Sequence, residues 1–158
     1  MIAVENVSHR IGGAAILTDV SLAIPRGGLT ALIGPNGAGK STLLSLVARL
    51  TPLQAGRVTV DGLDVSRTPS RDLARKLAIL RQDPAIAARL TVRDLVGFGR
   101  YPHSRGRPGL EDAAAVEAAI ERFALGPLAG RFLDELSGGQ RQRALVAMTF
   151  AQETDYIL

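Results

Sequence analysis

The sequence lacks several residue types, and each absence excludes a class of protein. It contains no cysteine and no tryptophan. The other large aromatic residues are two tyrosines and four phenylalanines. Without cysteine, the chain forms neither a disulfide framework nor a thiolate metal site. Residues 1–6 include no basic stretch leading into a long apolar one, so no secretory signal is expected. Apolar runs are far shorter than the roughly 20 residues that a membrane-spanning helix needs, and we expect a soluble chain.

Lysine is also scarce, because it occurs only at Lys40 and Lys76 in a chain with 19 basic residues and a net charge of +4. Two interpretations of this arginine richness are open. A nucleic-acid surface would cluster its arginines and interleave aromatic side chains for base stacking. The arginines are instead spread along the chain and the aromatics are few. We therefore favour a GC-rich coding sequence as the origin and expect no nucleic-acid partner.

The most informative motif is Gly-Pro-Asn-Gly-Ala-Gly-Lys-Ser-Thr over residues 34–42, which matches G-x-x-x-x-G-K-[ST]. Its glycines let successive backbone N–H groups turn inward around a phosphate. Lys40 brings a positive charge to the β- and γ-phosphates, and the Ser41 hydroxyl suits Mg²⁺. The motif therefore predicts a nucleotide site formed by Gly34, Pro35, Asn36, Gly37, Ala38, Gly39, Lys40, Ser41 and Thr42.

This phosphate loop, residues 34–42, has the flanks that the motif requires. Leu29–Ile33 is a short apolar run of the kind that forms a buried parallel strand. Apolar residues at spacings of three and four follow over Lys40–Leu50 and predict a helix whose positive N-terminal end faces the phosphates. An ordinary glycine-rich turn between a strand and a helix is the alternative. The Lys-Ser pair at the required place, with both flanks, favours the nucleotide site.

Hydrophobic periodicity and turn residues predict the remaining elements. Short strands are predicted over Ile2–Val7, Val20–Ile24, Arg57–Val60 and Leu77–Leu80, and from Asp155 onward. Helices are predicted over Asp72–Lys76, Val92–Phe98 with Thr91 as its cap, Glu111–Phe123, and from Ser137 to about Ala151, with a Gly/Pro/Arg-rich loop over Gly99–Gly109. The pattern indicates an α/β nucleotide-binding core, a small N-terminal antiparallel β layer and a helical insertion.

A second motif, Leu-Ser-Gly-Gly-Gln over residues 136–140, lies well after the phosphate loop. Ser137 at a helix start, with Gly138 and Gly139 behind it, presents a hydroxyl and bare N–H groups to an anion. Alone, this motif is equally typical of an ordinary capped helix. Together, the two motifs closely resemble the phosphate loop and the signature sequence of ATP-binding cassette (ABC) proteins, and the resemblance covers essentially the whole chain.

The resemblance implies a P-loop NTPase (RecA-like) core that binds ATP and Mg²⁺. In ABC proteins two cassettes pack head to tail, and the phosphate loop of one and the signature of the other enclose each ATP. The signature residues carried over are Ser137, Gly138, Gly139 and Gln140. Gln82 follows a predicted strand, as the family's Q-loop glutamine does, and would help to hold Mg²⁺ and the attacking water.

The same resemblance implies a division of the chain into three parts. Residues 1–84 would hold the β layer and the phosphate-loop core, and residues 85–136 the helical subdomain. Residues 137–158 would hold the signature helix and the start of the Walker B strand. In the catalytic role that the family implies, Lys40 stabilises charge on the transferred phosphoryl group and Gln82 lies beside it.

Three segments, residues 80–82, 90–102 and 153–158, are similar to the cassettes of iron(III)-siderophore importers. That resemblance implies an importer's ATPase subunit, cytoplasmic and peripheral on the inner face of the cell membrane. The implied partners are a second cassette (a homodimer or a paired cassette), an integral-membrane permease near Arg89–Pro102, and indirectly a substrate-binding protein. A soluble ABC ATPase acting on nucleic acid is less favoured, because such proteins usually carry two cassettes in one chain.

One departure from the ABC pattern concerns the nucleotide base. Ile11 stands where the family usually has an aromatic residue that stacks on adenine. An aliphatic side chain can pack on the base but loses the ring–ring contribution. Covering of the base by His9 or Arg10 is the alternative. The resemblance therefore leaves phosphate binding intact but weakens the expectation of base affinity and selectivity.

A second departure is that the chain ends at Leu158, where the sequence resembles the start of the Walker B strand. The family's Mg²⁺-securing Asp, its general-base Glu and its switch His would follow that point. We therefore expect a C-terminally incomplete cassette that is inactive and marginally stable alone. A non-catalytic nucleotide-binding module is the alternative if the chain truly ends there. Asp134 and Glu135 precede the signature, and we interpret them as helix-start charges.

Overall fold

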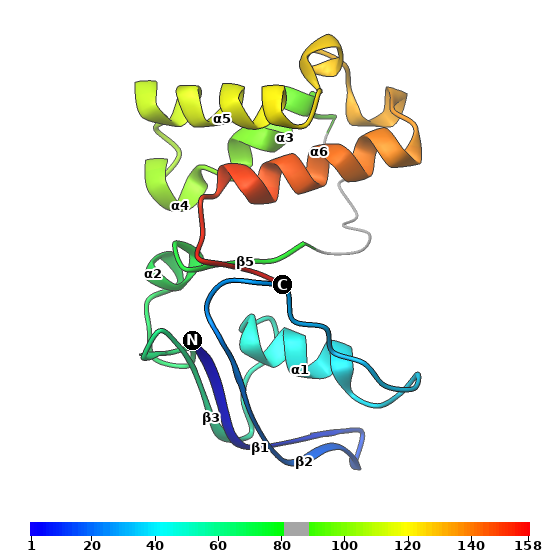
Figure 1. Cartoon of the computed structure of the whole chain (residues 1–158), viewed down its shortest axis with the longest axis vertical. Helices are drawn as coiled ribbons and strands as arrows, with labels where there is room; N and C mark the ends of the chain where they lie inside the picture. The colour runs from blue at the N-terminus through cyan, green and yellow to red at the C-terminus, as the bar shows by residue number, and fades with distance from the viewer. Residues whose placement is uncertain (81–88) are drawn as a thin grey trace. The chain divides into compact units, whose positions relative to one another are not determined.

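The computed structural model describes residues 1–80 and 89–158, which form two compact units (Figure 1). The first unit is Met1–Leu77 together with Leu158, and the second unit is Ala78–Ile157. The phosphate loop belongs to the first unit, and the signature segment, Leu136–Gln140, belongs to the second. Gln82 lies outside the described residues.

The first unit is built on an antiparallel sheet of four strands in the order β2-β1-β3-β4. This arrangement confirms the predicted N-terminal antiparallel layer, and each of the three strands predicted there is longer than expected. The strands are β1 (Ile2–Ile11), β2 (Ala14–Ile24), β3 (Ala55–Val60) and β4 (Leu63–Asp64). Apolar side chains of β1 and β3 start the core of this unit, with Ile2, Val4, Val7, Val58 and Val60 all buried.

Strand β1 continues past Val7 because an irregularity in the pairing is bridged by side chains. The register with β2 shifts on both sides of Val7, and Asn6 and Asp19 both have a φ of 49°. The Asn6 side-chain amide donates to Oδ1 of Asp19 over 2.8 Å, and the Asn6 backbone N–H donates to Oγ of Ser21. These bonds satisfy groups that a regular ladder would pair, so the strands stay together beyond the bulge.

Helix α1 (Lys40–Val47) directly follows the phosphate loop. It buries Leu43, Leu46 and Val47 at the spacing of three and four that the sequence indicated. The helix was predicted to reach Leu50, but it ends at Val47. Arg49 takes the left-handed conformation with a φ of 56°, which closes the last turn and sends the chain away from the helix axis.

The predicted strand over Leu29–Ile33 is not formed, and that prediction is wrong. These residues have no regular secondary structure, and the side chains of Leu29 and Ile33 are 98% and 89% exposed. A strand exists only where a neighbouring strand supplies hydrogen-bond partners. Among the described residues, the strands pair in one sheet of four and one of two, and neither includes this segment. A β-like sequence without a partner therefore remains irregular.

The second unit is helical. Its helices are α3 (Val92–Phe98), α4 (Tyr101–Ser104), α5 (Leu110–Arg122) and α6 (Gly138–Ala151), with short 3₁₀ turns η1 (Gly126–Leu128) and η2 (Leu133–Glu135). Helix α6 packs against both α3 and α5, as Figure 1 shows. Their common core consists of buried apolar side chains that include Val92, Leu95, Val96, Ala119, Ile120, Leu125, Ala144, Leu145 and Ala147.

Local signals predicted several boundaries in this unit well. The prediction for α3 is confirmed at both ends, and Oγ1 of Thr91 caps it by accepting from the Asp94 N–H over 3.1 Å. Ser137 caps α6 as predicted, and Glu135 accepts from the Phe132 N–H at the start of η2, as expected of a helix-start charge. The loop predicted over Gly99–Gly109 is wrong in part, because it contains α4.

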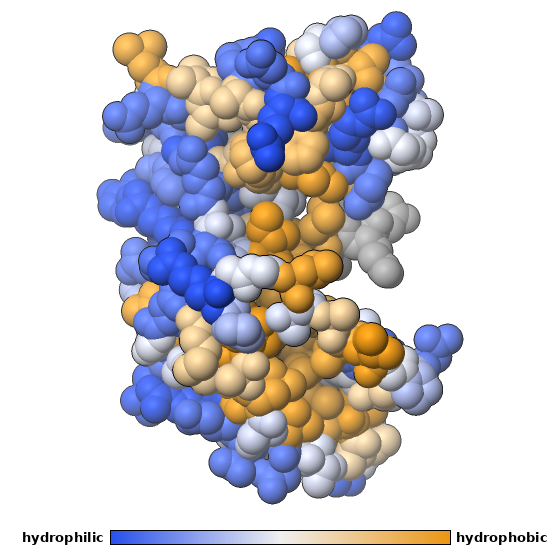
Figure 2. Space-filling model, viewed as in Figure 1, coloured by the Kyte–Doolittle hydropathy of each residue, from blue (hydrophilic) through white to orange (hydrophobic). Residues whose placement is uncertain are grey.

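The remaining short elements differ from expectation at their ends. Helix α2 is Ser70–Ala74, two residues before the predicted Asp72–Lys76. Strand β5 covers only Leu77–Ala78, and β6 covers Tyr156–Ile157; the two pair with each other. The space-filling view (Figure 2) shows apolar residues in orange at the surface around α1 in the first unit. Among the described residues, every helix is too short or too polar to cross a lipid bilayer.

Candidate functional site

The phosphate loop is an exposed turn that leads straight into α1. The Ala38 N–H donates to the Pro35 carbonyl over 3.3 Å, which closes the turn. Gly37 and Gly39 have φ angles of 82° and 84°, a backbone conformation that residues with a Cβ adopt at a cost. The positive φ angles at these two glycines bend the loop so that its backbone amides can surround an anion. Gly39 is also the N-cap residue of α1, so the loop and the helix form one continuous structure.

Lys40, the first residue of α1, folds its side chain back over the loop. Its Nζ atom donates to the carbonyl oxygens of Gly34 and Pro35 over 2.8 and 2.7 Å. The phosphate loop itself therefore fixes the position of the ammonium group. The N-terminal turn of a helix also has N–H groups with no acceptor inside the helix, and it carries partial positive charge. Loop amides, ammonium group and helix end together suit a polyphosphate.

Gly39 is required by the packing of the first unit as well as by the turn. A Cβ placed on this residue would lie 2.8 Å from Cδ2 of Leu17 and 3.0 Å from the carbonyl oxygen of Ile16. Both neighbours belong to β2, and Leu17 is buried. The antiparallel sheet thus supports the end of the phosphate loop directly. The sequence motif gave no indication of this contact, because it depends on a strand distant in sequence.

Few side chains are available to contact a nucleotide base. Ile11 ends β1 and is 56% exposed, next to the turn into β2. The ring of His9 is buried, so it is not presented to a ligand. The Arg10 guanidinium folds onto the carbonyl of Gly13. Of the three residues considered for the base, Ile11 is therefore the one with a free apolar surface.

The signature segment forms the start of α6 in the second unit. Oγ of Ser137 accepts from the Gln140 N–H over 3.3 Å, and Oε1 of Gln140 accepts from the Ser137 N–H over 3.0 Å. This reciprocal pair is a capping box, which fixes the first turn of the helix. Gly138 and Gly139 occupy the next positions, where the backbone N–H groups point out of the helix end.

Nothing in the second unit's own packing requires glycine at positions 138 and 139. A Cβ on either residue would have no described atom within 4 Å, and both residues have ordinary helical φ angles. The absence of side chains leaves the N-terminal end of α6 open to solvent. The space there suits an approaching group that needs close access to the backbone, such as a phosphate.

The residues present fit Mg²⁺ at one position. Ser41 lies in the first turn of α1, is exposed, and carries a hydroxyl of the kind that ligates Mg²⁺ at phosphate loops. Gln82, the other ligand expected, is outside the described residues. Within residues 1–80 and 89–158, there is no group of three or more His, Asp or Glu side chains that could hold a metal ion on its own. A metal here would need oxygen atoms of the nucleotide.

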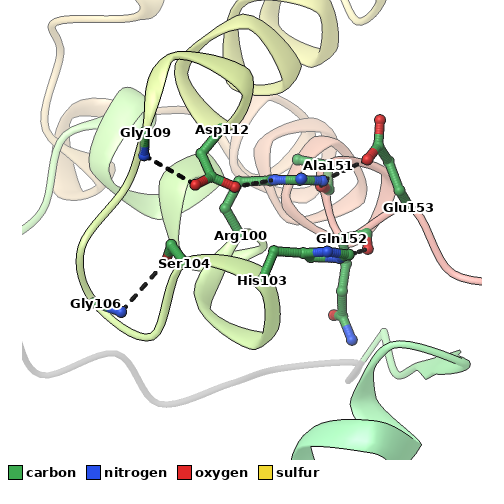
Figure 3. A network of polar contacts seen from close by, with 9 residues as sticks. All are labelled: Arg100, His103, Ser104, Gly106, Gly109, Asp112, Ala151, Gln152 and Glu153. Atoms are coloured by element: carbon green, nitrogen blue, oxygen red, sulfur yellow. Dashed lines mark hydrogen bonds and ion pairs between the residues drawn. The ribbon is translucent and has the colours of Figure 1, made fainter.

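A buried polar cluster in the second unit was not indicated by any sequence pattern (Figure 3). Arg100 lies between α3 and α4, and its Nε donates to Oδ1 of Asp112 over 3.0 Å. The side chains are 8% and 12% exposed. The N–H of Gly109 and the Arg100 guanidinium both stabilise the carboxylate, and together they hold the pKa of Asp112 below its ordinary value. A lone Arg and Asp twelve residues apart carry no local signature.

Comparison with known proteins extends these observations. The model of the ABC transporter family matches residues 17–158. The chain is 49% identical over 158 residues to the petrobactin import ATP-binding protein FatE of Bacillus anthracis, covering 100% of this chain and 63% of that protein. It is 40% identical over 156 residues to the iron(3+)-hydroxamate import ATP-binding protein FhuC of Bacillus subtilis (strain 168), covering 98% and 58%.

A solved structure of the ATP-binding subunit of an ABC transporter matches the fold with a TM-score of 0.85 at 25% identity, covering 99% of this chain and 65% of that one. The chain spans 58% to 63% of the length of the two curated relatives. The fold is therefore that of part of an α/β P-loop NTPase domain, with an antiparallel β layer and a helical insertion, as predicted. On these matches, the chain belongs to the ABC transporter family.

Proposed function

We propose that this chain is the nucleotide-binding part of an ATPase subunit that energises an ABC importer. The phosphate loop binds the triphosphate of ATP, and hydrolysis of the terminal phosphoanhydride bond yields ADP and phosphate. Two cassettes act together, so that the phosphate loop of one and the signature segment of the other enclose each nucleotide. The chemistry is that of phosphoryl transfer, in which positioning and charge stabilisation do most of the work.

The position of the Lys40 ammonium group carries this proposal. Its bonds of 2.8 and 2.7 Å to Gly34 and Pro35 hold the charge against the loop, at the N-terminal end of α1. A bound triphosphate has oxygens to replace both carbonyls as acceptors, so the ammonium group moves little on binding. Mg²⁺, when bound, neutralises phosphate charge. We propose Ser41 and Gln82 as its protein ligands, with Gln82 also orienting the attacking water.

The open N-terminal end of α6 supports the role of the signature segment. Ser137 and Gln140 cap each other, so the first turn of the helix is rigid before any ligand arrives. The backbone of Gly138 and Gly139 is unobstructed by described atoms. We propose that these four residues contact the phosphates of a nucleotide bound to the second cassette, a homodimer or a paired cassette.

The transport role rests on the relatives and on one surface feature. The relatives reported above are named for import of petrobactin and of iron(3+)-hydroxamate. A cavity of about 490 Å³ among α3, α4 and α5 is lined in part by Phe98 and Tyr101, which are 54% and 63% exposed. We propose iron-siderophore uptake, with residues 89–102 facing an integral-membrane permease that receives cargo from a substrate-binding protein. The chain would then work on the cytoplasmic face of the membrane, without a nucleic-acid partner.

The test of nucleotide binding uses the two lysines of the chain as a matched pair. Lys40→Ala removes the loop charge, and Lys76→Ala removes the only other lysine, which follows α2 outside the loop. A hydrogen bond to a charged group contributes about 1.5–3 kcal/mol, so ATP affinity should fall about 10- to 150-fold in the first variant. The second variant should bind as the unaltered protein does.

Isothermal titration with ATP and Mg²⁺ measures this difference, and release of phosphate measures hydrolysis in the complete ATPase subunit that carries the same substitutions. Equal ATP affinity in both variants would contradict the assignment of the phosphate loop. Binding without phosphate release, in the presence of the membrane partner, would favour the alternative of a non-catalytic nucleotide-binding module. Purification from membranes should recover a permease, and recovery of ribosomes or DNA instead would contradict the transport role.

A further inference from the structure

Helix α6 has the signature segment at its first turn and an unusual cap at its last. Nη1 of Arg100 donates to the carbonyl oxygen of Ala151, the last residue of the helix, over 2.8 Å (Figure 3). Nε2 of His103 lies 2.9 Å from the carbonyl oxygen of Gln152. Because a carbonyl only accepts, that ring nitrogen carries the hydrogen. Two consecutive carbonyls at the C-terminal end of α6 are thus bound by side chains, one from the corner between α3 and α4 and one from α4.

Arg100 is fixed from three sides. Besides Ala151, its guanidinium donates to Oδ1 of Asp112 at the start of α5 and to Oε2 of Glu153 just after α6, over 3.0 and 2.6 Å. Asp112 is in turn fixed by the Gly109 N–H over 3.0 Å. One buried guanidinium therefore joins the start of α5, the last residue of α6 and Glu153, two residues beyond α6. Arginine suits this because its donors diverge in one rigid plane.

This cap meets general expectations for a helix end. The last carbonyls of a helix have no partner inside the helix, and that end carries partial negative charge. A buried cation donates hydrogen bonds to these carbonyls and neutralises the partial negative charge. The burial also makes the arrangement demanding, because a buried charge that loses a partner is costly. The bonds of Arg100 thus favour one position of the C-terminal end of α6, and any other position would break them.

We propose that Arg100 and His103 are positioning residues for the ATP site, because they fix the C-terminal end of the helix whose N-terminal end presents the signature. The proposal rests on the function proposed above for Ser137–Gln140. Neither residue touches nucleotide in this assignment. Their effect is carried by α6 itself, which is fixed in direction when its far end is held.

The length of α6 makes this effect large enough to matter. A helix of 14 residues is about 21 Å long, since each residue adds about 1.5 Å. If the capped end is released and the helix tilts by about 5°, the signature end moves by roughly 2 Å. A displacement of about 1 Å of a positioning group can cost about 100-fold in rate. Turnover is therefore expected to be far more sensitive to the cap than nucleotide binding at the phosphate loop.

The test compares nucleotide affinity with turnover in the complete ATPase subunit that contains this chain, because the chain spans only 58% to 63% of the length of its two relatives. Arg100→Gln removes the charge, Arg100→Lys keeps it without the planar fork, and His103→Ala removes one carbonyl partner. Arg122→Gln is the matched control, because the Arg122 guanidinium also contacts the last turn of α6, 5.4 Å from the centre of the Phe150 ring, without capping a carbonyl. Circular dichroism and a urea midpoint establish that each variant is folded.

The expected result is a split between the two measurements. Arg100→Gln should bind ATP within about twofold of the unaltered protein but turn over at least tenfold more slowly, with partial rescue in Arg100→Lys. His103→Ala should show a smaller loss of turnover, and the control should show none. Folded Arg100→Gln with unchanged turnover would overturn the proposal, as would equal losses in the control.

A second variant decides the question if Arg100→Gln fails to fold. His103 is only half-buried and contributes one bond, so His103→Ala then decides: unchanged turnover in that variant overturns the proposal. The failure of the underlying function looks different. If the complete ATPase subunit that contains this chain neither binds nor hydrolyses ATP, the proposed ATPase function is wrong, whereas normal hydrolysis in every cap variant refutes the positioning role alone.

Discussion

Arg100 and Asp112 form a buried ion pair that joins the corner after α3 to the first turn of α5, with Nε and Oδ1 3.0 Å apart. The pair is part of a larger cluster, because Asp112 also accepts from the Gly109 N–H and Arg100 also donates to the Ala151 carbonyl at the end of α6 and to Glu153 beyond it. Without the Asp112 charge, the buried guanidinium would keep its desolvation cost and would have only Glu153, whose side chain is 60% exposed, as a counter-charge. The stability of the second unit should therefore depend on the charge of Asp112.

Asp112→Asn tests this dependence with almost no change in shape. The substitution should lower the urea midpoint of unfolding, because Arg100 loses a counter-ion in a buried place. Glu111→Gln is the control, since Glu111 is the neighbouring acid in the same helical turn and is exposed. A midpoint equal to that of the control would contradict a stabilising role for the pair.

Acid should destabilise the protein for a related reason. Hydrogen bonds from Thr91 lower the pKa of Asp94, and the bond from the Gly109 N–H followed by that from Arg100 lowers the pKa of Asp112. A carboxyl whose pKa is lower when folded binds protons more readily when unfolded. Its contribution is complete above the unfolded pKa, about 3.9, and is lost as the pH falls through the lower folded value.

The measurement is the urea midpoint between pH 7 and pH 2. Titration of Asp94 and Asp112 should leave the midpoint unchanged from pH 7 down to about pH 4. Below about pH 4, the midpoint should decrease. Asp94→Asn should flatten the fall, because one of the two groups no longer titrates. An equally steep fall in that variant would show that Asp94 does not contribute to acid unfolding.

The sequence predicted elements best where the determining contacts are local. The start of α3 follows from Thr91 and Asp94, which form a capping box, and the start of α6 follows from Ser137 and Gln140 in the same way. The strand expected over Leu29–Ile33 failed for the opposite reason. Its formation depends on a neighbouring strand, which no local pattern specifies.

In the candidate site, too, local features were predictable from the sequence and long-range contacts were not. The phosphate loop is recognisable because its backbone angles demand glycine at fixed spacing, as at Gly37 and Gly39. The support that Leu17 gives to Gly39, and the cap that Arg100 gives to α6, join residues that are distant in sequence. Such contacts depend on the packed fold, so a single sequence does not reveal them.

Gly99 and Gly97 offer a matched test of how closely α3 approaches α6. A Cβ on Gly99 would lie 2.2 Å from the backbone carbonyl oxygen of Met148, whereas one on Gly97 would have no described atom within 4 Å. Gly99→Ala should force the helices apart and cost about 1–3 kcal/mol or more of unfolding free energy. Gly97→Ala should be neutral or stabilise by up to about 1 kcal/mol, because alanine favours a helix.

Urea unfolding of the two glycine variants measures this difference directly. The first should unfold at clearly lower urea than the unaltered protein, and the second at the same or higher urea. Equal midpoints would show that the end of α3 moves away from Met148 without cost. That outcome would also weaken the inference that α6 is held in one position at this corner.

Gly138→Ala separates the function of the signature segment from its folding. Gly138 opens α6 with no described atom within 4 Å of an added Cβ, so the fold should tolerate alanine without loss of stability. If a phosphate bound to a second cassette approaches this backbone, the methyl group will obstruct it, and turnover should fall at least about tenfold, as when one positioned donor to an active site is lost. Binding of ATP to the phosphate loop of the same chain should be unchanged.

Gly130→Ala is the control for this last variant, because Gly130 is in the same unit, also has no described atom within 4 Å of an added Cβ, and lies outside the signature. Phosphate release at saturating ATP, with urea midpoints for both variants, distinguishes the outcomes. A selective loss of turnover in Gly138→Ala ties the open end of α6 to the nucleotide. Equal turnover in the two variants would mean that the glycine is there for another reason, and that the signature segment does not approach the phosphates as proposed.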